Sequence, residues 1–259
     1  MSGGIVGVVI AHEINGLDDL LQSSQRFAPG LELVLYDSGV DCLGQVTGLP
    51  TIPTARPLRY AKIGTCFLDI VEWFVEEAAG VAWINLESDM LFIRPGFTDW
   101  LATEMITADY LAARLHRVKP RSNWRPARSL RAEGRRTLLD LLGSDALYGA
   151  FSPGQVFGAR FCRLMVEHAR FHELRQFMLR NEQDGGAYSM QETVFPTAAM
   201  ALGMRVARYP DGSQFSNRYR PYFGRSGVTR ALADESVYFV HPVRRDPDDP
   251  ARQAFVGRP

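Results

Sequence analysis

Residues 81–89 of this 259-residue chain have the sequence VAWINLESD, and this stretch decides the fold class. Its first six residues are predominantly apolar, which is typical of a strand buried on both faces of a sheet. Two carboxylates, Glu87 and Asp89, follow the strand directly. Because residues i and i+2 of an extended chain point to the same side, we expect both side chains to face one crevice at the carboxyl edge of the sheet.

Strands and helices alternate before this stretch. The alternation predicts an α/β fold, in which a Rossmann-type mixed and mostly parallel sheet is flanked by helices on both faces. The predicted strands are 5–10, 31–36 and 81–86, with 90–93 continuing extended; the predicted helices are 16–27, capped by Asn15, and 60–79; and residues 41–57 are predicted to form a loop.

The second half of the chain is less regular. We expect one domain over residues 1–245, made of halves 1–100 and 101–245, followed by a tail, 246–259, that adds little to the core. The predicted elements of the second half are helices at 97–107, 160–180 and 191–202, strands at 110–115 and 237–240, and a turn with a short strand at 152–158.

The composition is that of an ordinary globular protein, with 46% hydrophobic and 22% charged residues. The 29 basic and 29 acidic residues cancel, so the overall charge indicates neither a nucleic-acid partner nor a membrane partner. The apolar run near residue 5 is far shorter than the roughly 20 residues of a membrane span, and we expect no integral membrane segment. Cys42, Cys66 and Cys162 form no C-x-x-C pair, so we expect reduced, mostly buried thiols and a cytoplasmic protein.

The two carboxylates after the strand could bind one hard cation. Ligation by oxygen alone suits Mg²⁺ or Mn²⁺ better than zinc. A third ligand is available in His241, which follows the last predicted strand, because neutral imidazole binds such ions well. The alternatives are a solvated strand end or helix cap for Glu87 and Asp89, and a structural role for His241.

Residues 81–93, VAWINLESDMLFI, resemble the GT-A class of glycosyltransferases. In that class an apolar strand ends in a D-x-D motif and continues into another apolar segment. Glu87 stands where the first Asp is usual, so the match departs from the pattern at that position. The resemblance implies a nucleotide-binding half at 1–100 and an acceptor-side half at 101–245, and it identifies no specific family.

The resemblance also implies roles for individual residues. Asp89 would ligate a metal ion, and Glu87 would face the ribose of a donor or a metal-bound water. Ala11 and Asp37 would hold the nucleotide base and ribose. The positions implied for donor binding are Ala11, His12, Asp37, Lys62 on the helix before the motif, Glu87, Ser88 and Arg244, and those implied for the metal are Glu87, Asp89 and His241.

Two acidic residues are candidates for the catalytic base of an inverting enzyme, which takes the proton from the acceptor hydroxyl. Glu192 is the first candidate and Asp184 its competitor, and a helix-capping role is the alternative for both. The turn at residues 152–155 resembles an acceptor-side loop, although a plain Pro-Gly turn explains it as well. Arg244 and Arg245 could contact a diphosphate, or they could be solvated.

An arginine-rich stretch spans residues 114–136 and contains a single acid, Glu133. Its irregular spacing favours a solvated or flexible loop. Contact with an anionic acceptor or a membrane surface is a second interpretation, and nucleic-acid binding a third.

Together these features predict a metal-dependent glycosyltransferase of the hexosyltransferase type. It would move a sugar from a UDP- or GDP-sugar donor, with Mn²⁺ or Mg²⁺, to the hydroxyl of an unknown acceptor, for which an anionic molecule is one option. One alternative is a sugar-nucleotide nucleotidyltransferase, which would be favoured by a Gly-rich basic loop where residues 11–15 are AHEIN. The other is a non-catalytic binding or scaffold protein, in which Glu87 marks decay of the motif.

Overall fold

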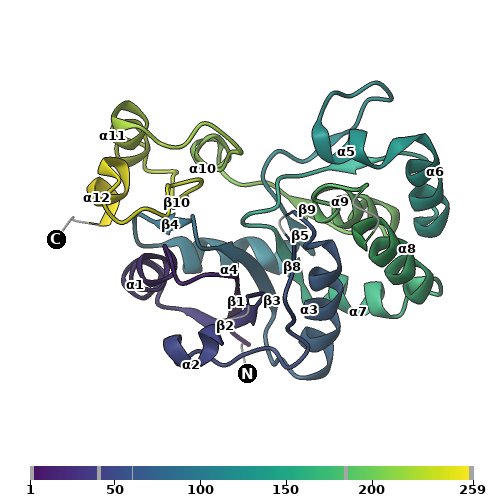
Figure 1. The fold of residues 1–259 in the computed structure, drawn as a ribbon, viewed down its shortest axis with the longest axis horizontal. Coiled ribbons are helices and arrows are strands. Elements are labelled where there is room, and N and C mark those ends of the chain that lie inside the picture. Colours follow the sequence, from purple (N-terminus) through teal and green to yellow (C-terminus); the bar gives the residue numbers. More distant parts are fainter. Residues whose placement is uncertain (1–2, 40–41, 60, 184–185, 257–259) are drawn as a thin grey trace.

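A six-stranded sheet forms the centre of the molecule in the computed structural model, which describes residues 3–39, 42–59, 61–183 and 186–256 (Figure 1). The strand order is β2-β1-β3-β8-β5-β9. The pairs β1/β2, β1/β3 and β5/β9 are parallel, and β8 is antiparallel to both of its neighbours. The predicted mixed α/β fold is therefore confirmed. The strands are β1 (Ile5–Ala11), β2 (Leu31–Asp37), β3 (Ala82–Glu87), β5 (Tyr110–Leu111), β8 (Val156–Gly158) and β9 (Val206–Ala207).

Helices cover one face of the sheet around a large aromatic cluster. Trp83 of β3 stacks on Phe157 of β8 with ring centroids 4.2 Å apart, and Phe67 packs edge-on against both rings. Burial of large aromatic rings supplies much of the driving force for closing such a layer. The helices of this face are α3 (Gly64–Glu76), α7 (Ala159–Val166), α8 (Phe171–Gln183) and α9 (Gln191–Ala201).

The opposite face is covered by α1 (Leu17–Phe27) and α4 (Phe97–Thr107). Ile84 and Leu86 point to this face, whereas Trp83, which precedes Ile84, points to the other, as the period of two in a strand requires. The same alternation sends the side chains of residues 85 and 87 towards the layer that contains α9.

The C-terminal residues form a small layer of their own beside α1 (Figure 1). Its strand β10 (Phe239–Val240) pairs antiparallel with β4 (Leu91–Phe92). Its helices are α10 (Asp211–Ser216), α11 (Arg225–Ala233) and α12 (Pro250–Val256). Phe255 of α12 is buried against Phe223, and Arg252 is 1% exposed, with bonds to Asp19 and to the carbonyl of Gly16.

The expectation that residues beyond 245 add little to the core is therefore wrong, since Ala251 and Phe255 of α12 are buried in the core of the C-terminal layer. The division of the chain into 1–100, 101–245 and 246–259 stays a prediction.

The second half of the arginine-rich stretch is helical, contrary to the predicted loop. Residues of α5 (Arg125–Ser129) and α6 (Arg131–Leu142) occupy its second half. The helix α6 is anchored by Leu138, Leu141 and Leu142, which lie at its C-terminal end beyond the irregular run of arginines. The helical part of the stretch is therefore packed through Ala127 and Leu130 within it and through the leucines beyond it.

Several other predicted bounds differ from the structure. Gly16, in a left-handed conformation with φ of 79°, precedes α1 in place of an Asn15 cap. A short helix, α2 (Leu43–Thr47), lies within the predicted loop. Residues 160–180 form two helices, and the predicted strand at 110–115 is shortened to β5, followed by β6 (His116–Arg117), which pairs with β7 (Tyr148–Gly149). Within the described ranges, no helix has the length and apolar character needed to cross a bilayer.

Candidate active site

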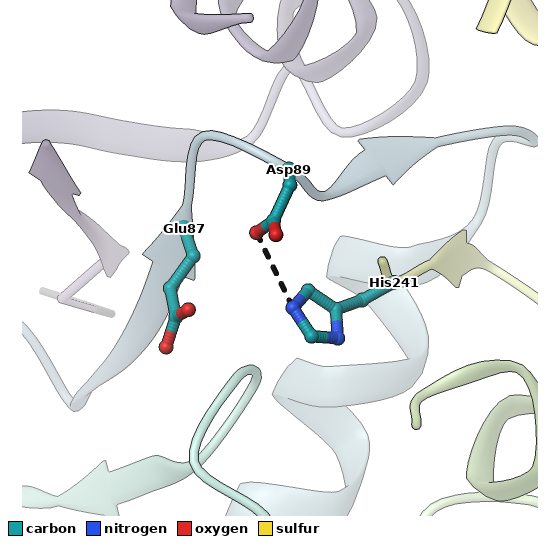
Figure 2. Close-up of side chains that lie close together, drawn as sticks. All are labelled: Glu87, Asp89 and His241. Atoms are coloured by element: carbon teal, nitrogen blue, oxygen red, sulfur yellow. Dashed lines mark ion pairs between the residues drawn. The ribbon is translucent and has the colours of Figure 1, made fainter. Parts of the chain in front are cut away.

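Glu87, Asp89 and His241 converge at the carboxyl edge of the sheet (Figure 2). One ligand atom from each of the three lies within 4.8 Å of the others. Glu87 ends β3, and Asp89 lies in the turn that follows, where the Met90 N–H donates to the carbonyl of Glu87 at 2.8 Å. Asp89 is thus outside the extended segment in which the sequence placed it. The turn brings the two carboxylates to one side.

His241 reaches Asp89 because β10 pairs with β4. Leu91 is opposite Val240 in this antiparallel pair, so the residues just before β4 and just after β10 are neighbours. The N–H of Val243 donates to the carbonyl of Asp89 at 2.9 Å and continues the pairing past the strands. Backbone hydrogen bonds therefore fix the distance between Asp89 and His241.

The contacts of His241 define which ring nitrogen faces the carboxylates. Nδ1 lies 2.9 Å from the carbonyl oxygen of Arg218, which can only accept a hydrogen bond, so Nδ1 carries a proton. Nε2 lies 3.2 Å from Oδ1 of Asp89. In neutral His241, Nε2 therefore carries no proton, and its lone pair points into the space between the carboxylates. An imidazole that binds a metal through one nitrogen and an outer partner through the other has this arrangement.

Burial and mutual charge set the ionisation of the three groups. Burial raises the pKa of Glu87, and the charge of Asp89 raises it further against the opposing effect of His241. Burial would also raise the pKa of Asp89, but His241 outweighs it and lowers that pKa to about 2. Burial lowers the pKa of His241, yet Asp89 more than reverses this.

In this buried space, the imidazole of His241 thus offsets part of the negative charge of the two carboxylates. Two carboxylates and one imidazole nitrogen form a donor set that fits a divalent cation such as Mn²⁺ or Mg²⁺, whose charge would stabilise both ionised carboxylates at once.

A turn at residues 152–155 forms the floor beside Glu87. The Asn85 amide donates to the carbonyl of Ser152 at 3.1 Å, and the Gly154 N–H donates to the carbonyl of Asn85 at 2.9 Å. Asn217 and the Tyr209 hydroxyl bind the carbonyls of Pro153 and Gly154 at 2.7 and 2.6 Å. The turn is therefore held from both halves of the chain.

Buried amide groups surround this turn. The Gln191 amide donates to the Ser152 hydroxyl at 3.2 Å, and that hydroxyl lies 3.5 Å from Oε1 of Glu87. Within the described residues, the side-chain oxygens of Asn85, Gln155 and Gln191 are buried without a hydrogen-bond partner. Buried polar atoms of this kind are uncommon in native proteins and are expected where a ligand or water binds.

From the sequence, Asn85 and Gln191 were given no role at the site, and Gln155 was considered only as part of the turn at residues 152–155. The available signal was Asn85 itself, a carboxamide inside an otherwise apolar strand.

Glu192 lies in the first turn of α9 and reaches the same floor. Its Oε1 accepts the N–H of Ser152 at 3.2 Å, and its side chain is largely buried. Burial raises its pKa to about 8, with a further contribution from the charge of Glu87. The structure thus brings Glu192 near the carboxylate cluster, and its catalytic role stays a prediction. Asp184, the competing candidate, lies outside the described residues.

The residues predicted to hold a nucleotide lie along the same edge. Ala11 and Asp37 end β1 and β2 and are paired in register, and Ile10 is in register with Glu87. His12 follows Ala11 on the exposed side. Three adjacent parallel strands thus present Ala11, Asp37 and Glu87 at one carboxyl edge, where α/β folds bind ligands.

The remaining predicted donor-binding residues are Lys62, Ser88 and Arg244. Lys62 precedes α3 and is not within it, since that helix begins at Gly64; its amine bonds to the carbonyl of Ala187, and burial lowers its pKa. Ser88 is buried in the turn. Arg244 pairs with Asp249 at 3.4 Å, whereas the charge of Arg245 acts on both Glu87 and Asp89.

No protein-family model matches the chain, and no curated protein matches its sequence. Among solved structures, the chain is similar to the galactosyltransferase LgtC in complex with donor and acceptor sugar analogs, with 14% identity and a TM-score of 0.52 over 97% of this chain and 94% of that chain. An active-site mutant of LgtC gives the same values. The glycosyltransferase GlyE of Streptococcus pneumoniae TIGR4 matches 95% of this chain and 56% of its own, with 11% identity and a TM-score of 0.47.

The likeness to LgtC extends over nearly the whole of both chains. It shows that the chain has a GT-A-like glycosyltransferase fold, in agreement with the resemblance in residues 81–93.

Proposed function

We propose that this protein is a metal-dependent glycosyltransferase that uses a nucleoside diphosphate sugar. The observation that carries the proposal is the convergence of Glu87, Asp89 and His241 at the edge where β1 and β2 also end. A site that combines two carboxylates and an imidazole at the carboxyl edge of three parallel strands suits a diphosphate with its counterion.

In this proposal the three residues hold Mn²⁺ or Mg²⁺. Such an ion, when bound, supplies electrostatic stabilisation of a departing diphosphate, the group on which negative charge develops. The residues at the ends of β1 and β2, Ala11, His12 and Asp37, position the nucleoside, for which UDP and GDP are both open. Arg245, or Arg244 beside it, adds positive charge at the diphosphate.

The buried amides at the floor position the donor sugar. The unpartnered oxygens of Asn85, Gln155 and Gln191 are acceptors that sugar hydroxyls can satisfy. Because leaving them without partners costs free energy, a hydroxyl-rich ligand gains affinity there that an apolar one does not.

Glu192 is the proposed base, with Asp184 as its competitor. Because burial and the charge of Glu87 raise its pKa to about 8, Glu192 is mostly protonated at neutral pH when no cation is bound. A cation at the neighbouring carboxylates would favour its ionised form, so metal binding and proton acceptance are coupled in this proposal.

Two further observations support the proposal. The LgtC structure, which has the same fold, contains donor and acceptor sugar analogs. Cys42, Cys66 and Cys162 are all free, which agrees with a reducing compartment such as the cytoplasm. Residues 11–15 lack a Gly-rich basic loop, which disfavours the nucleotidyltransferase alternative. A nucleotide titration distinguishes the transferase from a non-catalytic scaffold, because metal-dependent nucleotide binding is expected of the transferase alone.

The test is calorimetric titration of UDP and GDP into the protein with Mn²⁺ and with a chelator. We expect one nucleotide to bind only when Mn²⁺ is present, and Asp89→Asn to weaken that binding by about a hundredfold. Asp145→Asn, which removes an exposed carboxylate far along the chain, is the matched control and should bind as the wild type does. Metal-independent binding, or full Mn²⁺-dependent binding by Asp89→Asn, would contradict the proposal.

A further inference from the structure

A cavity is lined by residues of α10, of α11 and of the segment that joins them. Both helices belong to the C-terminal layer (Figure 1). The cavity has a volume of about 320 Å³, and its wall contains both helices and the residues that join them. Two guanidinium groups, those of Arg218 and Arg230, line it, together with the aromatic rings of Phe215 and Phe223. None of these four side chains takes part in the carboxylate cluster.

Arg218 is held in place on this wall. Its Nε donates to the carbonyl of Pro221 at 3.2 Å, and its guanidinium lies over the ring of Phe223, 4.3 Å from the centroid. A guanidinium that is stacked and anchored through Nε keeps its two terminal nitrogens free to form a fork with an oxyanion.

Two guanidinium groups and two carboxylates line the cavity, but the arginines are not neutralised by direct ion pairs with those carboxylates in the part of the chain that the structure describes. The charges that act on Arg218 are those of Arg114 and Arg230, and together with burial they lower its pKa. Asp211 and Asp234 also line the cavity, but within the described residues neither forms an ion pair with Arg218 or Arg230. One Asp234 oxygen is instead occupied by the N–H and hydroxyl of Ser236, at 2.9 and 2.7 Å.

Arg114 is fixed beside the cavity by an unusual backbone conformation. Its φ of 58° is left-handed, and its N–H donates to the Gln214 side chain of α10 at 3.1 Å. Non-glycine residues in this conformation carry a strain that surrounding contacts must sustain, and such residues cluster at functional sites. Three arginines are thus held close together despite their mutual repulsion. They are Arg114 between β5 and β6, Arg218 between α10 and α11, and Arg230 in α11.

The cavity is connected to the carboxylate cluster through the backbone. The carbonyl of Arg218 is the partner of His241 Nδ1, and the Arg218 N–H donates to the carbonyl of His241 at 3.0 Å. The preceding residue, Asn217, binds the floor turn at the carbonyl of Pro153. A molecule bound against Arg218 therefore lies next to the elements that form the floor and the histidine ligand.

From this geometry we propose that the cavity between α10 and α11 binds an anionic group, a phosphate or a carboxylate, on a sugar that serves as the acceptor. The arginines bind the oxyanion, the exposed Phe215 ring offers a face for a sugar ring, and Asp211 and Asp234 accept hydrogen bonds from its hydroxyls. That the sugar is an acceptor rests on the proposed glycosyl transfer. Binding of the anion does not.

The test measures binding to the metal-free, nucleotide-free protein by ligand-observed NMR titration. The probes are inorganic phosphate and glucuronate, which separate the two sources of negative charge, with glucose as the uncharged control. We expect saturable binding of at least one anion and a loss of about tenfold in affinity in Arg230→Gln. Arg230 is exposed, so this change should leave the fold intact.

The matched control is Arg225→Gln, which removes the same charge from α11 but on the face that lines a different cleft. It should leave anion affinity unchanged. Equal losses in both variants would mean attraction by net charge alone and would overturn the proposal, as would no saturable binding or an unaffected Arg230→Gln protein. Because no metal or nucleotide is present in this titration, failure of the Asp89→Asn test would rule out the acceptor role of the bound sugar but not the binding of the anion. A second readout follows if transfer is observed: Arg230→Gln should raise KM for an anionic acceptor and leave KM for the donor unchanged.

Discussion

The Nε2 atom of His241 lies 3.2 Å from Oδ1 of Asp89, and the pairing of β10 with β4 holds the two side chains there. The contact joins a residue near the end of the chain to one at the end of a central strand. It makes the C-terminal layer part of the candidate active site.

Replacing His241 by Asn should weaken Mn²⁺ binding. The change removes one of three ligand atoms, and since even indirect partners of a ligand contribute about tenfold or more, we expect a loss of at least about tenfold. The measurement is a Mn²⁺ titration of the purified protein, and the control is His172→Asn, which alters an exposed imidazole on α8. Unchanged Mn²⁺ affinity in His241→Asn would exclude His241 as a ligand.

Glu192 should make stability fall with rising pH. Its pKa is raised to about 8 by burial, above its value in the unfolded chain, so its contribution is fully present below about pH 4.5 and is lost as pH rises through about pH 8. Urea unfolding of the chelator-treated protein should therefore show the wild type losing stability relative to Glu192→Gln across this window. A difference that does not vary with pH would show that Glu192 titrates normally.

The ion pairs of Asp109 should make stability fall at low pH. Arg205 and Arg160 hydrogen bond to its buried carboxylate, and these bonds lower its pKa to about 2. The contribution is present above about pH 4 and is lost as pH falls through about pH 2, so Asp109→Asn should be about 2 kcal/mol less stable at pH 7 and progressively less so in acid. Thermal unfolding from pH 7 to pH 2 checks this, with Asp145→Asn as the control that should track the wild type.

The turn beneath Glu87 should not tolerate a side chain at Gly154. This residue has φ of 75°, and an added Cβ would lie 3.0 Å from the Phe239 ring. Gly143 also has a positive φ, of 62°, but an added Cβ there meets nothing within 4 Å. Both alanine variants incur the backbone cost of about 1 kcal/mol, and Gly154→Ala should lose about 1–3 kcal/mol more through crowding. Denaturant unfolding compares the two, and equal losses would show that the turn can shift freely.

Local sequence was sufficient for the three adjacent parallel strands β2, β1 and β3. They are mainly apolar runs between helical segments, a pattern typical of parallel strands with helices on both faces of the sheet. The helix at residues 97–107 was predicted to the residue, because its apolar period and flanking Pro-Gly are both local signals.

Local sequence failed where a distant contact supplies the stability. The helix α12 has a weak apolar pattern, and it forms because Phe255 meets Phe223 and Arg252 binds the start of α1. The start of α6 was not predicted for a similar reason. It lies among the arginines of residues 114–136, and the leucines that anchor the helix lie at its far end.

The sequence by itself determined that two carboxylates follow a buried strand, because strand burial and the order of residues are properties of the local chain. It also placed Ala11 and Asp37 at strand ends, since parallel strands finish at a common edge. Only the tertiary structure decided which groups complete the site. The pairing of β4 with β10 brings His241 to Asp89, and the turn at Ser152 brings Glu192 and the buried amides beneath Glu87. These contacts depend on backbone hydrogen bonds between segments far apart in the chain, and no local pattern specifies such a pairing.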